Sequence, residues 1–112
     1  MEDLITIDEL ARVDLRAGKV LAASAPEWSK KLIKQEVDFG EEIGKKIIFS
    51  GLRKWYEPED FVGKTLVYVV NLPARKMGEE ESQGMILAVE DSKGVPRRWE
   101  LPESVLAGTR VS

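Results

Sequence analysis

Cysteine and histidine are both absent from the 112 residues of this chain. Without them the protein can form no disulfide, no thiolate or imidazole metal site, no cysteine nucleophile and no serine triad with a histidine base. Carboxylates remain, but the acidic clusters at residues 57–60 and 79–81 lack the Asp-x-Asp-x-Asp-Gly spacing of a calcium loop, and we interpret them as solvated loops. We therefore expect no catalytic residue, no metal and no cofactor, and we favour a binding protein over an enzyme.

Long hydrophobic runs are also absent. No uninterrupted apolar stretch exceeds the one from Leu66 to Val70, which is far shorter than the roughly 18–20 residues that a membrane span needs. The first nine residues contain four acids, where a secretory signal would carry lysine or arginine before a long apolar block. These absences predict a soluble, cytoplasmic protein that does not enter a membrane.

Hydrophobic residues make up 43% of the chain and charged residues 33%, a balance that can bury a core and still keep a polar surface. A length of 112 residues is typical of one domain, because the chain is too short to enclose two separate hydrophobic cores. We expect residues 1–112 to form a single domain with short flanking segments at both ends.

The net charge of −3 is distributed unevenly. From Lys30 to Lys76 there are ten basic residues against seven acidic ones, a local charge of +3, whereas the rest of the chain carries −6. Binding to a polyanion depends on such local patches more than on the total charge. Charge runs of this size are more often ordinary solvated surface, so the patch needs a motif beside it before it indicates a site.

Short apolar runs separated by turn residues dominate the chain and indicate β-strands. The residues from Arg12 to Ser24 predict one curved strand with a bend or bulge at Gly18. The run at 65–70 is β-branched and apolar, as in a strand that is buried on both faces. Together with it, further strands are expected at residues 31–39, 45–49 and 84–89, and a last extended segment at 97–101.

Other segments have the features of turns and helices. Pro58 followed by two acids suits the first turn of a short helix, expected at about residues 57–62. The Gly-Glu-Glu sequence at 40–42 is a turn candidate, and an N-terminal helical turn is expected from Ile7 to Ala11. The acidic residues before Gly84 are expected to form a flexible loop.

Five strands with a short helix between the third and the fourth is the order of the OB-fold, a five-stranded Greek-key barrel of the all-β class. Such barrels commonly bind oligonucleotides or oligosaccharides on one face and its loops. On pattern alone, an SH3-like barrel or a small sandwich remains an alternative, because short apolar runs fix neither strand pairing nor register.

A specific motif lies between residues 67 and 88. Its first part, Val67 to Gly78, is a hydrophobic strand that ends in Asn-Leu and is followed by an Arg-Lys pair. Its second part, Glu81 to Ala88, places Glu-Ser-Gln-Gly-Met at the start of the next strand. This arrangement resembles the tRNA-binding domain family. The resemblance extends upstream to residues 13–20, 31–40, 50–51, 56–59 and 63–64, and so covers nearly the whole chain.

The family includes free-standing dimeric tRNA-binding proteins, the C-terminal domain or separate β subunit of methionyl-tRNA synthetases, and a domain of phenylalanyl-tRNA synthetase β chains. The resemblance implies a non-catalytic module that binds tRNA by its structure, with an aminoacyl-tRNA synthetase catalytic subunit as a further candidate partner. It also implies a homodimer, because family members without a second appended domain usually pair through the segments that flank the barrel. Here these segments are Leu4 to Leu10 and Trp99 to Val111.

Two departures from the usual pattern leave a second function open. Where the family usually has Asn-Ala-Asp-Lys-Leu, this chain has Trp-Ser-Lys-Lys-Leu at residues 28–32, so a base replaces the acid. The loop from Gly40 to Gly44 resembles a branch of single-domain proteins described as export chaperones, which would bind unfolded polypeptides through an exposed apolar patch. That branch tends to lose the Ser-x-Gly-Met element present here, and the sequence therefore favours tRNA binding.

The basic stretch and the resemblance together give a set of candidate tRNA-binding residues. Basic side chains along one rim of the barrel would meet phosphates, while a hydroxyl, an amide and a methionine at the last strand would contact ribose or an unstacked base. The alternative is a solubility surface for the basic residues and core filling for the methionine. The set is Lys30, Lys31, Lys34, Arg53, Lys54, Lys64, Asn71, Arg75, Lys76, Ser82, Gln83 and Met85.

Aromatic residues are further candidates as stacking platforms for bases, although they more often fill cores or interfaces. Those considered are Trp28, Trp55 and Tyr56. Trp99 is assigned instead to structure or to a subunit contact.

Overall fold

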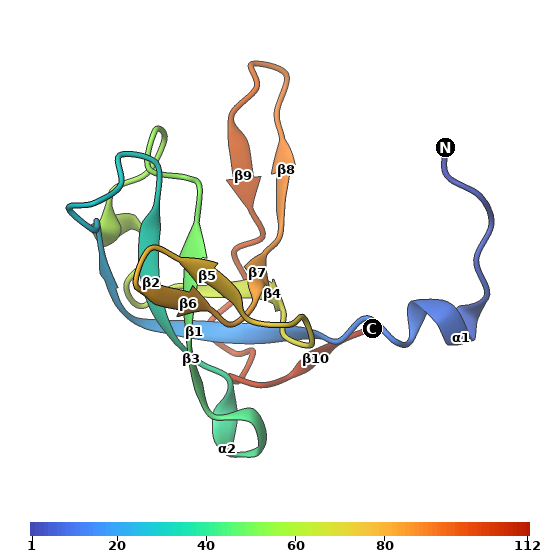
Figure 1. The fold of residues 1–112 in the computed structure, drawn as a ribbon. Coiled ribbons are helices and arrows are strands. Elements are labelled where there is room, and N and C mark those ends of the chain that lie inside the picture. The colour runs from blue at the N-terminus through green and yellow to red at the C-terminus, as the bar shows by residue number, and fades with distance from the viewer.

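The computed structural model describes residues 1–112, and its centre is one antiparallel sheet. The strands of this sheet are β1 (Leu15–Ser24), β2 (Ile33–Asp38), β3 (Lys45–Ser50), β4 (Thr65–Val69), β7 (Met85–Ile86) and β10 (Arg110–Val111). They lie in the order β3-β2-β1-β4-β7, with β10 beside the first residues of β1 (Figure 1). Because β4 returns to pair with β1 after the β1-β2-β3 meander, the connection is a Greek key.

Side chains complete the closure of this sheet into a barrel, between β3 and the residues just before β7. The backbone N–H of Gln83 donates to the carbonyl of Ile47 (2.8 Å), and Gln83 Oε1 accepts from the N–H of Ile47 (2.8 Å). Next to them, Ser82 Oγ accepts from the N–H of Phe49 (3.0 Å). These side-chain oxygens replace backbone carbonyls and satisfy donors that an open edge would leave unpaired. The predicted OB-fold barrel is confirmed.

Strand β1 is irregular, as expected for a long curved strand, but not at the expected residue. Its pairing with β4 passes through Gly18 without interruption, and the register with β2 shifts between Val20 and Ala22. Gly18 serves close packing instead, because an added Cβ would lie 2.5 Å from Val37 Cγ1 and 2.6 Å from a ring carbon of Phe39. The bulge therefore lies two residues after Gly18, and at Gly18 itself the absence of a side chain makes room for the core.

The core fills the inside of the barrel. Phe39 and Tyr68 are both buried and meet edge to face, with their ring centroids 5.5 Å apart. All residues of β4 are buried, as predicted for residues 65–70. Burial also raises the pKa of the Tyr68 phenol, which keeps its proton at neutral pH. Truncating an aromatic such as Phe39 to alanine at a site of this kind costs about 3–5 kcal/mol of unfolding free energy.

The helices are short. At the N-terminus α1 (Ile7–Leu10) begins with a capping box in which Thr6 and Glu9 each satisfy the other's backbone N–H. The expected turn at residue 40 is one turn of helix, α2 (Gly40–Ile43), and the expected helix between the third and fourth strands is a 3-10 turn, η1 (Pro58–Asp60). No helix in the structure is long and apolar enough to cross a membrane.

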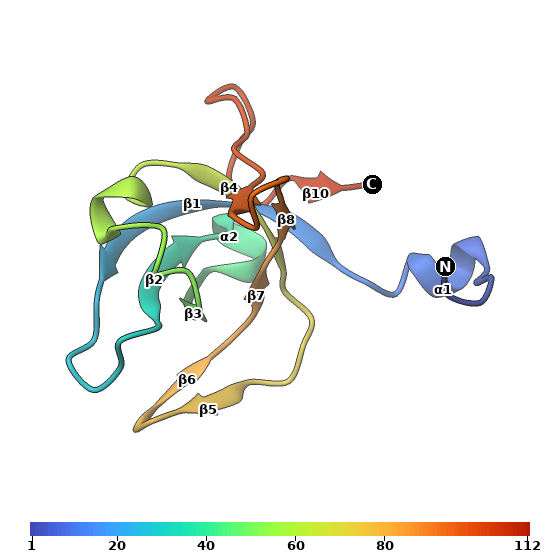
Figure 2. The same cartoon turned by 90° about the horizontal axis from the view of Figure 1, so that it is seen from above.

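Two short hairpins extend from the barrel, and the sequence pattern did not predict them. Strands β5 (Arg75–Met77) and β6 (Glu80–Ser82) form an arm on one side of the molecule, where a flexible loop was expected (Figure 2). The predicted strand at 84–89 is divided, because β7 pairs with β4 whereas β8 (Ala88–Glu90) pairs with β9 (Pro96–Arg98) in a hairpin outside the barrel (Figure 1).

Candidate nucleic-acid interface

A groove of about 800 Å³ opens on the surface between the end of β3, the β5–β6 hairpin and β7. Phe49 and Leu52 form part of its inner wall, and Met77 and Met85 contribute from the hairpin and from β7. Its lining is mainly apolar, with Arg75 as its one basic residue. The groove can therefore accept a flat, weakly polar group that carries a negative charge on one side.

The exposed large apolar side chains of the groove are Met85 and Leu72, at 48% and 45% exposure. Met85 belongs to β7 and faces Val69 in the register of β4. Its exposure excludes the alternative interpretation of Met85 as core filling. Met77 and Leu72 were not among the candidates from the sequence. Both lie in the first part of the motif, Val67 to Gly78, and their apolar side chains close to the Arg-Lys pair were the available indication.

Arg75 and Lys76 lie on opposite faces of the β5–β6 hairpin. The register pairs Arg75 with Ser82 and Lys76 with Glu81. Because successive side chains of a strand alternate between faces, Arg75 points to the groove with Met77, and Lys76 points to the outer face. The two neighbours in sequence, which were expected to act as a pair, are separated by the structure.

The other basic candidates divide into bound and free cations. Lys34 is paired with Glu80 (2.5 Å) and Lys64 with Glu100 (3.2 Å). Arg53 donates to the backbone carbonyls of Pro26 and Ser29 and thereby holds the loop between β1 and β2. Lys54 lies over its neighbour's indole, with Nζ 5.4 Å from the Trp55 ring centroid. Among these candidates, the exposed cations with no ion pair, no side-chain hydrogen bond and no aromatic contact are Lys30, Lys31, Arg75 and Lys76.

Lys64 lies apart from this group. It precedes β4, whereas the groove lies beyond the other end of that strand, where Leu72 and Pro73 line it. Its carboxylate partner, Glu100, has its pKa lowered chiefly by the hydrogen bond from Lys64, and Coulombic attraction to Lys64 and Arg98 adds to the effect. Lys64 is therefore better explained as part of a surface ion pair than as part of the groove.

The polar members of the candidate set are held by backbone groups of the protein. Ser82 is 4% exposed, and its hydroxyl accepts from the N–H of Phe49 and donates to the carbonyl of Gly84 (3.1 Å). The amide oxygen of Gln83 is occupied by the N–H of Ile47. These two residues therefore build the barrel edge from which Met85 projects, and their oxygens are not presented to the groove as free ligands.

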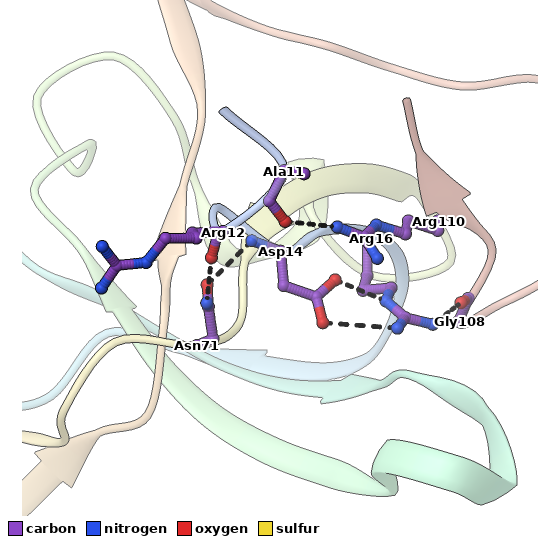
Figure 3. Close-up of polar contacts among 7 residues, drawn as sticks. All are labelled: Ala11, Arg12, Asp14, Arg16, Asn71, Gly108 and Arg110. Carbon is purple, nitrogen blue, oxygen red and sulfur yellow. Dashed lines mark hydrogen bonds and ion pairs between the residues drawn. The ribbon is translucent and has the colours of Figure 1, made fainter. Parts of the chain in front are cut away.

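Asn71 has a similar structural role at the end of β4 (Figure 3). Its Oδ1 accepts from the N–H of Asp14 (2.9 Å), and its Nδ2 donates to the carbonyl of Arg12 (2.6 Å). The carboxylate of Asp14 in turn accepts from Arg16 Nε (2.6 Å), and this hydrogen bond is the main cause of a lowered pKa for Asp14. Arg16 Nη1 also donates to the carbonyl of Gly108 (3.1 Å), so this cluster ties the N-terminal segment to the C-terminal one.

Only two of the aromatic candidates are well exposed beside the basic loops. Trp28 is 50% exposed, packs 5.7 Å from the Phe49 ring and lies against the hairpin turn at Gly78. Trp55 is 40% exposed. Tyr56 is instead structural, because its hydroxyl donates to the carbonyl of Pro96 (2.7 Å) and the guanidinium of Arg98 lies 4.2 Å above its ring.

A second apolar surface lies at the termini, away from the groove. Helix α1 projects from the barrel on its own (Figure 2), and Ile7 and Leu10 are 79% and 54% exposed. Between α1 and β10 there is an apolar cavity of about 620 Å³, with Val13 and Val111 in its lining. No group of three or more acidic side chains that could hold a metal ion is present in the structure.

The family described as "Putative tRNA binding domain" matches residues 15–110. The chain belongs to the tRNA-binding domain family. The match runs from the first residue of β1 to the first residue of β10 and includes the groove, both hairpins and the barrel edge formed by Ser82 and Gln83. Membership of the family confirms the interpretation of the motif at residues 67–88.

Individual relatives agree with this assignment. A methionine–tRNA ligase of Deinococcus radiodurans is 48% identical over 114 residues, which cover 98% of this chain but only 16% of the ligase. The crystal structure of a MetRS-related protein from Pyrococcus horikoshii is 35% identical with a TM-score of 0.91, covering 99% of this chain and all of the other. The chaperone CsaA from Bacillus anthracis is 29% identical with a TM-score of 0.85, covering 98% of this chain and all of that one.

Proposed function

We propose that this protein is a non-catalytic module that binds tRNA by its structure, with an unstacked segment of the RNA held in the groove. The observation that carries the proposal is the combination of an exposed Met85 with Arg75 on the same apolar groove. An unstacked base packs on Met85 while a neighbouring phosphate meets Arg75. Bases are accessible in this way in loops and at ends rather than in a duplex, so an irregular part of the tRNA is recognised.

The free cations extend this site along the backbone of the RNA. Lys30 and Lys31 lie in the β1–β2 loop next to Leu32, which lines the groove, and the backbone N–H of Arg53 donates to the Lys31 carbonyl (3.2 Å). They and Lys54 meet phosphates further along the strand, and Trp28 and Trp55 offer surfaces for stacking. Ser82, Gln83 and Asn71 contribute by supporting the backbone around the groove, and not by direct contact with ribose.

The test is a titration of labelled tRNA with the protein over a series of salt concentrations. We expect the logarithm of the association constant to fall linearly with the logarithm of the salt concentration, by roughly 0.7 to 0.9 for each phosphate contact. A duplex RNA of equal length is the matched control, and it should bind more weakly because its bases stay stacked. Absence of tRNA binding, or equal affinity for the duplex, would contradict the proposal.

The exposed apolar residues of α1 support a homodimer in which the terminal segments of two copies pack together. Isolated, Ile7 and Leu10 would leave a large apolar area in contact with water, and association of two such surfaces removes it. Sedimentation should therefore show about twice the chain mass of 12.6 kDa. Leu10→Glu should yield the monomer, whereas Val62→Glu, a control at a 49% exposed apolar residue outside the terminal segments, should not.

The identity with methionine–tRNA ligase supports a second partner, a synthetase catalytic subunit in the cytoplasm. A tRNA-binding module attached to or associated with such an enzyme raises the local concentration of its substrate. Adding the protein to a methionyl-tRNA synthetase catalytic core should lower the KM for tRNA and leave kcat unchanged. An unchanged KM at saturating protein would exclude this partner.

Binding of unfolded polypeptides is the alternative function, and the observation in its favour is the likeness to CsaA along the whole chain. An apolar contact of this kind depends little on salt, whereas phosphate contacts weaken steeply as salt is added. Titration with a permanently unfolded polypeptide at low and high salt separates the two functions. Tight, salt-independent binding of that polypeptide together with weak binding of tRNA would favour the chaperone.

A further inference from the structure

Three polar side chains form a hydrogen-bonded chain across the inside of the barrel. Tyr68 and Gln35 are fully buried, and Ser50, at the end of β3, is 4% exposed. Tyr68 Oη lies 2.8 Å from Gln35 Oε1, and Gln35 Nε2 lies 2.6 Å from Ser50 Oγ and 3.0 Å from the carbonyl oxygen of Ile33. Burying a polar group in a small core costs free energy unless the group has a hydrogen-bond partner. The positions of the protons therefore decide which group donates and which accepts.

The carbonyl of Ile33 sets the direction of every hydrogen bond in this chain. A carbonyl only accepts, so the end of the Gln35 amide beside it is the nitrogen, and the amide oxygen lies toward Tyr68. That oxygen also only accepts, so Tyr68 is the donor there. The second proton of Gln35 Nε2 is directed at Ser50 Oγ, which must accept it.

Ser50 Oγ is then left with its own hydroxyl proton and one further lone pair. The hydroxyl accepts from Gln35, and no group of the protein accepts a hydrogen bond from it. Ser50 also lines the groove, beside Leu52 and Ile86. Ser50 Oγ accepts from Gln35 in the core, and Ser50 borders an open groove. Its hydroxyl proton is therefore available to a molecule that fills the groove.

We infer that Ser50 is a specificity-determining residue of the tRNA site and donates a hydrogen bond to an acceptor atom on the edge of the unstacked base. The inference deepens the proposed tRNA binding and rests on it. The acceptor is a base oxygen or ring nitrogen and not a phosphate oxygen. The residues beside Ser50 are apolar, and the basic residue of the groove, Arg75, belongs to the hairpin at its edge, so a phosphate here would lose water without a counter-charge.

The fixed direction of the hydrogen bonds also gives selectivity. Ser50 Oγ keeps one lone pair, but a buried donor without an acceptor costs more than an unused second lone pair, so the hydroxyl proton governs which partner fits best. A base that presents only an amino group at this point can donate to the remaining lone pair, but it leaves the hydroxyl proton of Ser50 without an acceptor. Bases with an acceptor at that point are therefore preferred.

The experiment compares three variants in titrations with tRNA and with short single-stranded oligonucleotides of adenine, cytosine or uracil. Ser50→Ala removes the donor, Ser50→Thr keeps the hydroxyl, and Tyr68→Phe removes the hydrogen bond at the far end of the chain while leaving the Ser50 proton free. All affinities are measured below the melting transition of the least stable variant. Tyr68→Phe is the matched control, because it loses a buried hydrogen bond and stability without losing the donor.

We expect Ser50→Ala to weaken tRNA binding by roughly three- to thirtyfold, the usual effect of one lost hydrogen bond to a buried site, with no change in salt dependence. The variant should also reduce the differences among the three oligonucleotides, whereas Ser50→Thr and Tyr68→Phe should behave like the wild type. Unchanged tRNA affinity in Ser50→Ala, or an equal loss in Tyr68→Phe, would overturn the inference while leaving the proposed function in place. If the wild-type protein itself does not bind tRNA, both are refuted.

Discussion

Lys34 and Glu80 form an ion pair that joins β2 to the β5–β6 hairpin, with Lys34 Nζ 2.5 Å from Glu80 Oε1. The two side chains are 32% and 38% exposed, so water and salt screen the pair. Pairs of this exposure contribute only about 0–1 kcal/mol, which is little enough for a phosphate to replace the carboxylate. The pair therefore neutralises Lys34 next to the β5–β6 hairpin.

Glu80→Gln should release Lys34 and strengthen tRNA binding. The freed lysine adds one phosphate contact, so the log–log slope against salt should become steeper by roughly 0.7 to 0.9. Fluorescence anisotropy at several salt concentrations measures both quantities.

The control for this prediction is Glu79→Gln, which makes the same change in net charge at an exposed residue of the same hairpin that has no ion pair. It should raise affinity slightly at low salt through the general charge, without adding a contact. An identical change of slope in Glu79→Gln and Glu80→Gln would show that the ion pair has no particular role.

Arg75→Ala and Lys76→Ala should differ, because the two side chains lie on opposite faces of the hairpin. Arg75→Ala should weaken binding of all tRNAs and reduce the salt slope by roughly 0.7 to 0.9, as expected for one lost phosphate contact. Lys76→Ala should have a much smaller effect on both. Equal losses in the two variants would place the RNA on both faces and contradict the groove as the site.

Met85→Ala should reduce the free energy of tRNA binding by about 1–3 kcal/mol, as the loss of a contact with one base does. The melting temperature should stay nearly unchanged, because the side chain is 48% exposed and packs little in the core. Val89→Ala is the matched control at a 57% exposed apolar residue of β8 outside the groove, and it should affect neither quantity. A large drop in melting temperature for Met85→Ala, with undiminished affinity of the folded fraction, would refute the contact.

Ser82→Ala should lower stability more than affinity. Removing the hydroxyl leaves the buried N–H of Phe49 without an acceptor, and an unsatisfied buried donor costs about 1–3 kcal/mol. Chemical denaturation measures this loss against Ser92→Ala, a control at an exposed serine with no side-chain hydrogen bond. If Ser82→Ala instead melts like the wild type and binds tRNA more weakly, the hydroxyl contacts the RNA and not only the barrel edge.

Asp14 should contribute to stability at neutral pH and lose that contribution in acid. Its hydrogen bond from Arg16 lowers the folded-state pKa below the ordinary value of 3.8, so folding favours the ionised carboxylate. The stabilisation is complete above about pH 5 and is lost as the pH falls through the folded pKa. Urea denaturation should show Asp14→Asn to be less stable than the wild type at pH 7, with a difference that shrinks below about pH 4.

The matched variant for this comparison is Asp3→Asn, which changes an exposed acid that pairs with no cation. It should follow the wild type at every pH. A difference between Asp14→Asn and the wild type that stays constant down to pH 2 would mean that packing, and not the charge of Asp14, is responsible.

The local sequence pattern was sufficient to predict those elements whose cause lies in their own residues. The buried run at 65–70, the apolar runs of β2 and β3 and the proline that begins η1 are each explained by their own residues, and each was placed within a few residues. The motif at residues 67–88 was sufficient for the family. Charge and composition located the basic stretch, but not which of its members are free.

Tertiary structure alone decided the roles of individual polar residues. Ser82 and Gln83 could be interpreted from the sequence as ligands for RNA, because nothing local shows that the donors of β3 lie beside them. The neutralisation of Lys34 by Glu80 joins residues 46 positions apart. The donor role of Ser50 depends on Gln35, Tyr68 and the Ile33 carbonyl from two other strands. Hydrogen-bond partners distant in sequence are set by strand pairing and barrel closure, and a sequence pattern determines which residues form strands without determining which side chains meet.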